Sequence, residues 1–528
     1  MKRRTLLQAA AATLAAPRIS EAASKRVLRF VPQGDVTVLD PIWTTTYPTR
    51  DHGYLVFDTL YGQEGPEHGF AVSPQMVEGH TVSSDGKEWR LTLRPGLKFH
   101  DNEKVLARDC VASIRRWGAR DSLGQALMAA TDALSAADDK TIVFRLKHAF
   151  PLLPQALGKS PPNMCAMMPE RLALTSPFKQ VTEMIGSGPY KFNAAERVSG
   201  SRVVYDRFSG YVPRPSGTPD WTAGPKITHF DRVEWHIISD PSTALSALST
   251  GEVDWWWIPD ALLLPVLHHT QNVSVRIVDP TGYIGTLRFN WLNPPFDNPA
   301  IRRAIIGAVS QAEYMTAVVG RDPSLWRDGV GYFCPGTPMA SDAGMSALTG
   351  PRDLGQVKKN LEAAGYRGEK VVLLAPQNIP SVKAVADVCN AMMKKIGLNV
   401  DYASMDWGTL VARRTGTAPV DKGGWSVFST FWGGLDIDNP AMNPFLRCNG
   451  KDAAPGWPSD AKMEQMRDTW LTAPDLATQK KIAAEMQLHA FDIVPYIPLG
   501  QQFNPTAYRN DITGILGGIP VFWNVRRS

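Results

Sequence analysis

Apolar and polar residues alternate with two different periods between residues 89 and 117, which predicts a strand followed by a helix. Trp89, Leu91 and Leu93 are separated by polar residues, a period of two that is typical of a strand with one solvent-facing side. Turn-forming residues at positions 83–86 precede this strand, so we expect a hairpin. Further along, the apolar residues recur every three or four positions and share one face of a helix; they are Leu106, Cys110, Ile114 and Trp117.

A strand, a helix and a second strand are predicted between residues 371 and 402. Residues 371–374 are all apolar, and Leu398, Val400 and Tyr402 alternate with polar residues. The segment between them carries one apolar helical face, made of Val382, Val385, Cys389, Met392 and Ile396. Because two strands joined by a helix pair in parallel through a right-handed crossover, this pattern predicts a sheet covered by helices.

The length and composition of the chain indicate a globular protein with at least two lobes. The 528 residues are 44% hydrophobic and 20% charged, which is enough to bury large cores. The formal charge is +5, but Lys2, Arg3, Arg4 and Arg18 against Glu21 give the first 22 residues +3 and leave +2 for the rest. That remainder has no lysine-rich run, so we expect no nucleic-acid partner. Sixteen tryptophans suit both large cores and a cleft that grips a ligand with flat surfaces.

The first 23 residues have the pattern of an export signal. A charged start is followed by a short, alanine-rich apolar stretch and by small residues near position 22. We therefore expect residues 1–23 to be removed and the mature protein to be periplasmic. Arg3 and Arg4 approximate a twin-arginine signal, and the general secretory route stays open as the alternative.

Five cysteines are scattered along the chain without the spacing of a metal site. Cys110 and Cys389 lie on apolar helix faces, where we expect buried thiols. An oxidising compartment permits one or two disulfides, and Cys334 with Cys448 is the pair to test first, since both lie in Gly- and Pro-rich surroundings.

Segments in a fixed order along the chain carry a family resemblance. They include TVSSDGKEWRLTLRPGLKFHDNEKVLARDCVASIRRW from position 81, GSGPYKF from 186, RVEWHIISDPSTALSALSTGEVDWWW from 232, LRFNWLNPPFDNPAIRRAIIGAVSQ from 287 and VPYIPLGQQFNPTAY from 494. Together they resemble the extracytoplasmic solute-binding proteins of ABC importers, in the class that carries dipeptides, oligopeptides and nickel. The resemblance covers nearly all of the chain after the export signal.

The resemblance implies an α/β, two-lobed periplasmic-binding-protein fold with mixed sheets covered by helices. The chain should cross between the lobes twice, near residues 284–290 and 494–502, and the two crossings should act as a hinge. The implied division is an export signal (1–23), a first lobe (24–60, 186–286 and 495–528), an additional subdomain on that lobe (61–185) and a second lobe (287–494). A monomer of this kind captures a small solute or peptide and delivers it to an ABC permease in the inner membrane, with no cofactor and no catalytic residue.

The resemblance also implies where the ligand contacts lie. Peptide-binding members use a tryptophan and an aspartate in a segment that corresponds to residues 430–440, TFWGGLDIDNP. The tryptophan's role as an aromatic wall transfers to Trp432. The aspartate of those members holds the ligand's amino group, and it does not transfer directly, because the candidate for it, Asp436, stands one position later than in the family. The other candidates lie in the loop after the first strand, on the strand that ends in three tryptophans, and beside the crossings; they are Tyr47, Arg50, Trp255, Trp257, Tyr283 and Gln502.

Several candidates have an alternative that involves no ligand. Asp436 could be a solvated or turn-capping carboxylate, and Arg50 could lie on the surface instead of meeting a ligand carboxylate. Trp255 and Trp257 share one face of a strand, where they could pack in the core or stack on a flat ligand. The departure at Asp436 and the added tryptophans leave opine-like, glutathione-like and plant-derived ligands open beside peptides.

The motifs of common enzymes and metal sites are missing from the sequence. It contains no G-x-S-x-G, H-E-x-x-H, G-x-x-x-x-G-K-[ST] or paired C-x-x-C segment. His268 and His269 are adjacent, so on a helix they point about 100° apart and we expect no metal site there. An exported hydrolase acting on peptides or glycans is the alternative function, and a binding protein that docks a chemoreceptor is a third.

Overall fold

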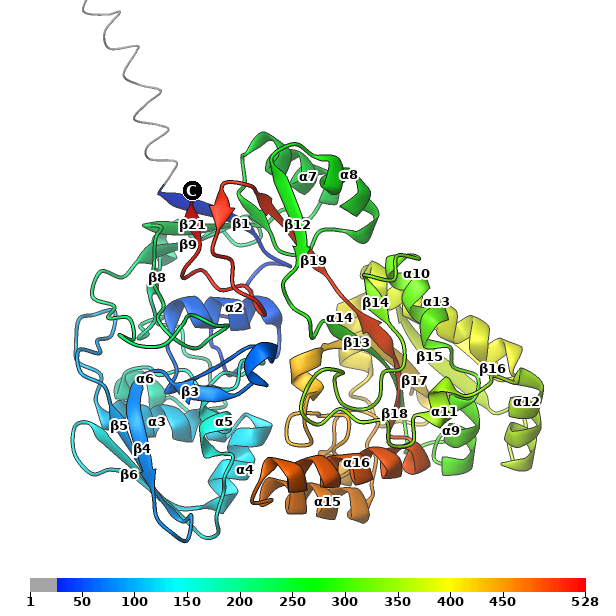
Figure 1. The fold of residues 1–528 in the computed structure, drawn as a ribbon. Helices are drawn as coiled ribbons and strands as arrows, with labels where there is room; N and C mark the ends of the chain where they lie inside the picture. The colour runs from blue at the N-terminus through cyan, green and yellow to red at the C-terminus, as the bar shows by residue number, and fades with distance from the viewer. Residues whose placement is uncertain (1–25) are drawn as a thin grey trace, which may run out of the picture.

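A seven-stranded mixed sheet forms the centre of the first lobe in the computed structural model, which describes residues 26–528. In order across the sheet, its strands are β12 (Val273–Ile277), β19 (Pro505–Arg509), β11 (Trp255–Trp256), β1 (Val27–Val31), β10 (Arg232–His236), β9 (Arg202–Arg207) and β8 (Tyr190–Phe192). β1 pairs in parallel with β10 and β11, and the outer pairs are antiparallel. α2 (Tyr47–Val56) covers one face, whereas α7 (Pro241–Thr250) and α8 (Leu264–His269) cover the other (Figure 1).

The additional subdomain is built on an antiparallel sheet of four strands. In order they are β4 (Val77–Val82), β5 (Glu88–Leu93), β7 (Thr141–Leu146) and β6 (Thr131–Ala136). The predicted hairpin is confirmed as β4–β5, and α3 (Ala107–Gly118) buries Cys110, Ile114 and Trp117 as its apolar stripe predicts. The subdomain also contains α4 (Ser122–Ala130), α5 (Leu153–Gly158), α6 (Glu170–Ala173), β2 (Tyr61–Gln63) and β3 (Val72–Pro74).

A six-stranded mixed sheet forms the second lobe, with helices packed around it (Figure 1). Its strands are, in order, β14 (Trp326–Arg327), β18 (Tyr496–Gln502), β13 (Tyr283–Phe289), β17 (Val427–Gly433), β15 (Lys370–Pro376) and β16 (Asn399–Met405). The helices of this lobe are α9 (Pro299–Ile306), α10 (Gln311–Val319), α11 (Ser346–Thr349), α12 (Leu354–Ala363), α13 (Pro380–Lys395), α14 (Trp407–Arg413), α15 (Ala461–Leu471) and α16 (Leu476–Ile493). The α/β fold with two lobes and an additional subdomain is therefore confirmed.

The strand–helix–strand unit predicted between residues 371 and 402 is also confirmed. β15 and β16 pair in parallel over seven residues each, and α13 connects them. α13 buries Val382, Val385, Cys389 and Met392, the face that the apolar spacing predicts. Local periodicity was sufficient here, because each element buries residues that repeat at its own period.

The chain passes between the two lobes twice. One passage is residues 278–282, between β12 and β13, and the other is residues 503–504, between β18 and β19. The stretches in which we expected the crossings, 284–290 and 494–502, lie mainly in β13 and β18. These two strands pair with each other inside the second-lobe sheet, so each passage lies a few residues away, where that pairing stops.

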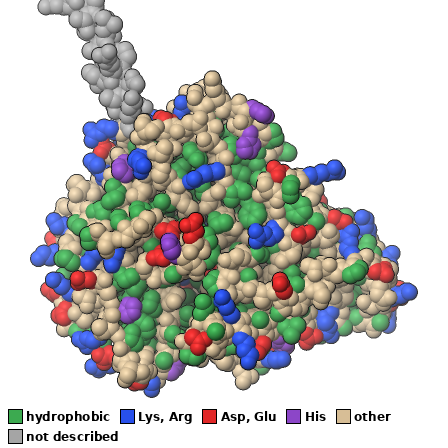
Figure 2. Space-filling view, viewed as in Figure 1, with side chains coloured by type: hydrophobic (Ala, Val, Ile, Leu, Met, Phe, Trp, Pro, Cys, Tyr) green, Lys and Arg blue, Asp and Glu red, His purple; other side chains and the backbone are tan. Residues whose placement is uncertain are grey.

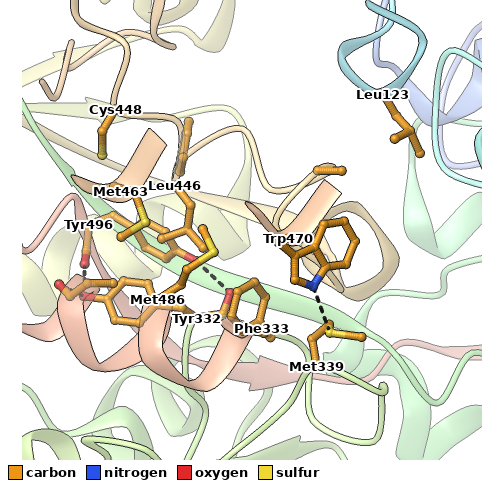
Figure 3. Close-up of a cluster of buried hydrophobic side chains, with 14 of the residues drawn as sticks. Leu123, Tyr332, Phe333, Met339, Leu446, Cys448, Met463, Trp470, Met486 and Tyr496 are labelled. Atoms are coloured by element: carbon orange, nitrogen blue, oxygen red, sulfur yellow. Dashed lines mark hydrogen bonds between the residues drawn. The ribbon is translucent and has the colours of Figure 1, made fainter. Parts of the chain in front are cut away.

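The second-lobe core joins residues from its helices, its sheet and its loops. Figure 3 shows Tyr332, Phe333, Met339, Trp470 and their neighbours in this core, with the indole Nε1 of Trp470 3.4 Å from the Met339 sulfur. Leu123 of α4 belongs to the same apolar cluster, although it comes from the additional subdomain. The hydroxyl of Ser122 also donates to the carbonyl of Ala441 at 3.3 Å, so the subdomain contacts the second lobe directly.

The interpretation that pairs Cys334 with Cys448 in a disulfide is wrong. All five cysteines are free and buried, which confirms the expectation for Cys110 and Cys389. Cys334 packs with Ile284 and Ile437, whereas Cys448 belongs to the larger second-lobe cluster. The Gly- and Pro-rich sequence around each cysteine does not show how close the two side chains lie, and a disulfide requires them to meet.

On the face shown in Figure 2, lysine and arginine side chains are interspersed with aspartate and glutamate. No helix within residues 26–528 combines the length and the apolar character that crossing a bilayer requires. The predicted export signal and its twin-arginine pattern lie outside the described residues. The chain ends on the first lobe with the short pair β20 (Ile512–Thr513) and β21 (Arg526–Arg527).

Candidate functional site at the lobe junction

Tyr47 of the first lobe contacts the second lobe through its hydroxyl group. Tyr47 is the first residue of α2, and its hydroxyl donates to Oδ2 of Asp436 at 2.7 Å. The N–H of Gly433 donates to Tyr47 Oη at 2.8 Å and to Asp436 Oδ2 at 3.2 Å. Tyr47 and Asp436 are 389 positions apart, so only the tertiary structure brings these two candidates together.

Asp436 is positioned by the turn that follows β17. Gly433 precedes the short 3-10 helix η5 (Gly434–Ile437), and the Asp436 carboxylate accepts the Gly433 N–H as in a capping box. Gly434 packs against the first passage between the lobes, because its N–H donates to Gly282 O at 2.8 Å. A β-carbon at Gly434 would lie 2.2 Å from Thr281 O, so only glycine fits. Asp436 is thereby held beside the passage.

Two further candidates pack against the Tyr47 ring. Tyr283 meets it edge-on, with ring centroids 5.5 Å apart and planes at 79°. The guanidinium carbon of Arg50 lies 4.8 Å from the centroid of the Tyr47 ring, a cation–π contact. Arg50 is only 7% exposed and its Nε donates to Asp51 at 2.9 Å, so the surface position considered for it is not the one observed.

Comparison with known proteins identifies the family of the chain. Residues 71–453 match the family model described as "Bacterial extracellular solute-binding proteins, family 5 Middle". A probable peptide ABC transporter periplasmic-binding protein from Sinorhizobium fredii is 36% identical over 527 residues, which are 98% of each chain. The chain belongs to bacterial extracellular solute-binding protein family 5.

More distant relatives of this family 5 protein include a glutathione-binding protein from Salmonella paratyphi A. It is 24% identical over 501 residues, which are 90% of this chain and 89% of the relative. Two solved structures share the fold, each with a TM-score of 0.78 over 95% of this chain. One is the binding protein AgaA from A. tumefaciens R10 with agropinic acid, at 21% identity and 99% of its chain; the other is a dipeptide-binding protein from Pseudoalteromonas with Met-Leu, at 19% and 100%.

Family membership makes the protein a solute-binding receptor and not an enzyme, so the hydrolase alternative is set aside. His268 and His269 lie at the end of α8. Within residues 26–528, no group of three or more His, Cys, Asp or Glu side chains is placed to hold a metal ion.

Acidic side chains outnumber basic ones at the lobe junction of this family 5 protein. Burial raises the pKa of Asp436, an effect that the Tyr47 hydroxyl and the Arg50 charge oppose. Burial and the charge of Asp436 raise the pKa of Asp438 to about 8. Lys159 also faces these carboxylates, but its ammonium is 2.5 Å from Asp121 and is already paired, just as Arg50 is paired with Asp51. The junction therefore suits a ligand with a positive group.

Trp432 on β17 and Gln502 on β18 lie next to the contact between Tyr47 and Asp436. Trp432 is half-buried and its ring packs on Phe445, with centroids 5.3 Å apart. Its Nε1 is buried and has no hydrogen-bond partner within residues 26–528. Gln502 pairs with Tyr283 in the β13–β18 ladder, so it is adjacent to the ring that packs on Tyr47.

Trp255 and Trp257 lie in the core of the first lobe, apart from the group around Tyr47. They share a face as their spacing predicts, since both belong to one apolar cluster and Trp256 belongs to another. Trp255 is fully buried, and its Nε1 donates to Thr506 Oγ1 at 2.7 Å. Core packing, the alternative considered for these residues, describes Trp255. Trp257 Nε1 is buried without a partner among the described residues.

The junction also includes residues that the sequence reasoning did not single out. They are Asp51, Asp121, Lys159, Gly433 and Asp438. Asp51 follows Arg50 directly, and the alternation of opposite charges was a usable signal. No motif marks Lys159 or Asp121, because their relation to the second lobe depends on how the subdomain docks.

Proposed function

We propose that this family 5 protein is the periplasmic receptor of an ABC importer and captures a peptide or peptide-like solute between its lobes. The printed function of the Sinorhizobium relative supports the transporter and the ligand class. The observation that carries the proposal is the group at the junction in which Tyr47 donates to Asp436 and packs against Arg50 and Tyr283. Residues 1–23 would be removed on export, and the mature protein would act as a monomer that docks the inner-membrane permease.

Each site residue would bind a different part of the ligand. Asp436 would hold the ammonium group of the solute, since the junction has more carboxylates than free cations. Trp432 would form an aromatic wall, and its unpaired Nε1 would donate to a ligand oxygen. Gln502 would add amide hydrogen bonds from β18. Arg50 would contribute mainly through its charge, because Asp51 occupies its Nε.

The two passages at residues 278–282 and 503–504 would act as the hinge between the proposed lobes. A solute held by both lobes favours the closed arrangement by its higher affinity for that arrangement. Closure would then present the joined surface of both lobes to the permease. The role requires reversible binding and no bond breaking.

Binding of a peptide panel tests this function. Met-Leu, Ser-Thr-Ser-Ala, glutathione and agropinic acid would be added to the purified mature protein while its melting temperature is measured. A ligand at about 100 times its Kd stabilises by about 2.7 kcal/mol, which raises the melting temperature by several degrees. We expect at least one peptide to do so and to be recovered unchanged. No response to any peptide, or recovery of cleaved peptide, would contradict the proposal.

Substitution of Asp436 tests the role of the junction. We expect Asp436→Ala to weaken binding of the responding peptide at least tenfold, because a charge-assisted hydrogen bond contributes about 1.5–3 kcal/mol. Isothermal titration calorimetry measures the loss. Asp421→Ala, at an exposed carboxylate on the second lobe, is the matched control and should leave the affinity unchanged. Equal affinities for the two variants would place the ligand elsewhere.

A further inference from the structure

The Tyr47 side chain has partners both at its hydroxyl and at its ring. Its hydroxyl uses both hydrogen-bonding roles, donating to Asp436 Oδ2 and accepting from the Gly433 N–H. Its ring is contacted by Arg50 and by Tyr283. A tyrosine held in this way has few other conformations available, so it can hold its partner in place as well.

The two oxygens of Asp436 have different surroundings. Oδ2 receives hydrogen bonds from Tyr47 and from the Gly433 N–H. Oδ1 accepts no hydrogen bond within residues 26–528 and is not fully enclosed, so it keeps some contact with solvent. Asp436 as a whole residue is 6% exposed. One oxygen therefore belongs to the contact between the lobes, and the other is accessible.

We propose that Tyr47 is a positioning residue that clasps the lobes together and turns Oδ1 of Asp436 toward the solute. The clasp comprises the Tyr47 hydroxyl, the Asp436 carboxylate and the Gly433 N–H. Because it consists of protein groups only, it favours closure at every ligand concentration. It also persists when the solute is bound, since the solute uses the other oxygen. The role in closure stands by itself, whereas the role toward the solute rests on the proposed function.

Removal of one hydroxyl tests the clasp. We expect Tyr47→Phe to lower the ratio of closed to open molecules about tenfold, equivalent to about 1.4 kcal/mol, and to weaken peptide binding by a similar factor. Small-angle scattering of the ligand-free protein should give a larger radius of gyration for this variant. Tyr508→Phe is the matched control, because the Tyr508 hydroxyl has no hydrogen bond within the described residues and lies on first-lobe β19. Identical scattering and affinity for both variants would overturn the proposal.

The pH dependence of binding separates positioning from a general loss of structure. The Tyr47 hydrogen bond lowers the pKa of Asp436, so its removal should raise that pKa. Binding of a peptide ammonium needs the ionised carboxylate, and its loss on acidification should therefore begin at higher pH in Tyr47→Phe than in the wild type. The other titratable groups that face Asp436 are unchanged in the variant; they are Arg50, Lys159, Asp438 and Tyr283. Coincident profiles would contradict the positioning role.

A measurement on the wild-type protein keeps the test independent of folding defects. Hydrogen exchange of the Gly433 amide should be slow without any peptide, because this N–H is held by the clasp. Rapid exchange would overturn the clasp even if Tyr47→Phe failed to fold. If no peptide binds the wild type, the proposed function fails, while scattering and exchange still decide whether the clasp exists.

Discussion

Replacing Arg302 with methionine is expected to destabilise the second lobe by about 4 kcal/mol. Arg302 is 1% exposed, and it donates to Phe296 O at 2.6 Å and to Ile493 O at 2.8 Å. It also reaches Asp297 O at 3.3 Å and lies 3.5 Å from the ring centroid of Trp291. Methionine fills much of the volume but donates nothing, so the carbonyls just before α9 and at the end of α16 lose their donor.

The adjacent arginine is the control for this prediction. Arg303 is the next residue of α9, and its pair with Asp492 is exposed, at 44% and 65% of the two side chains. Arg303→Met should therefore cost less than about 1 kcal/mol. Urea unfolding followed by tryptophan fluorescence measures both variants. Free energies of unfolding that agree within error would show that burial of Arg302 has no energetic consequence.

Replacing Lys226 with methionine is expected to cost about 3–5 kcal/mol, because it leaves a buried carboxylate without its cation. Lys226 and Asp58 are both fully buried, and Nζ lies 2.7 Å from Oδ1. Tyr211 donates to the other oxygen of Asp58 at 2.8 Å and the Thr59 N–H donates to Oδ1 at 2.9 Å, but these bonds do not neutralise the charge. The double variant Asp58→Asn/Lys226→Met removes both charges and should recover most of the loss, as measured by thermal unfolding.

The pH dependence of the same variant has a definite sign. Burial alone would raise the pKa of Asp58, but the charge and hydrogen bond of Lys226 outweigh it and hold that pKa below its usual value. In the wild type, Asp58 therefore contributes stability above the unfolded-state pKa of about 3.9, and this contribution is lost as the pH falls through the folded-state pKa. Without Lys226 the folded-state pKa rises, so the deficit of Lys226→Met should be smaller at pH 5 than at pH 7. A deficit that grows on acidification would refute this account.

Local sequence patterns predicted the helices and strands but not which of them contact one another. The stripe of α3 and the strand–helix–strand unit around α13 were predictable because burial there follows the period of a single element. The predicted positions of the passages between the lobes were off by a few residues. β13 and β18 end where their pairing with each other ends, and a short stretch of sequence does not show that pairing. The pairing of Cys334 with Cys448 was wrong for the same reason, because the residues around a cysteine in the sequence do not show which side chains lie near it in space.

The order of the resembling segments indicated the family and, through that resemblance, the two-lobed α/β fold, whereas apolar periodicity predicted which residues share a face of a strand or helix. Only the tertiary structure decided that Trp255 faces a core and that Tyr47 meets Asp436 across 389 positions. It also decided that Arg50 is buried beside Asp51 instead of exposed. The physical reason is that exposure, pairing of charges and pKa depend on which elements pack together, and packing joins residues that are distant along the chain.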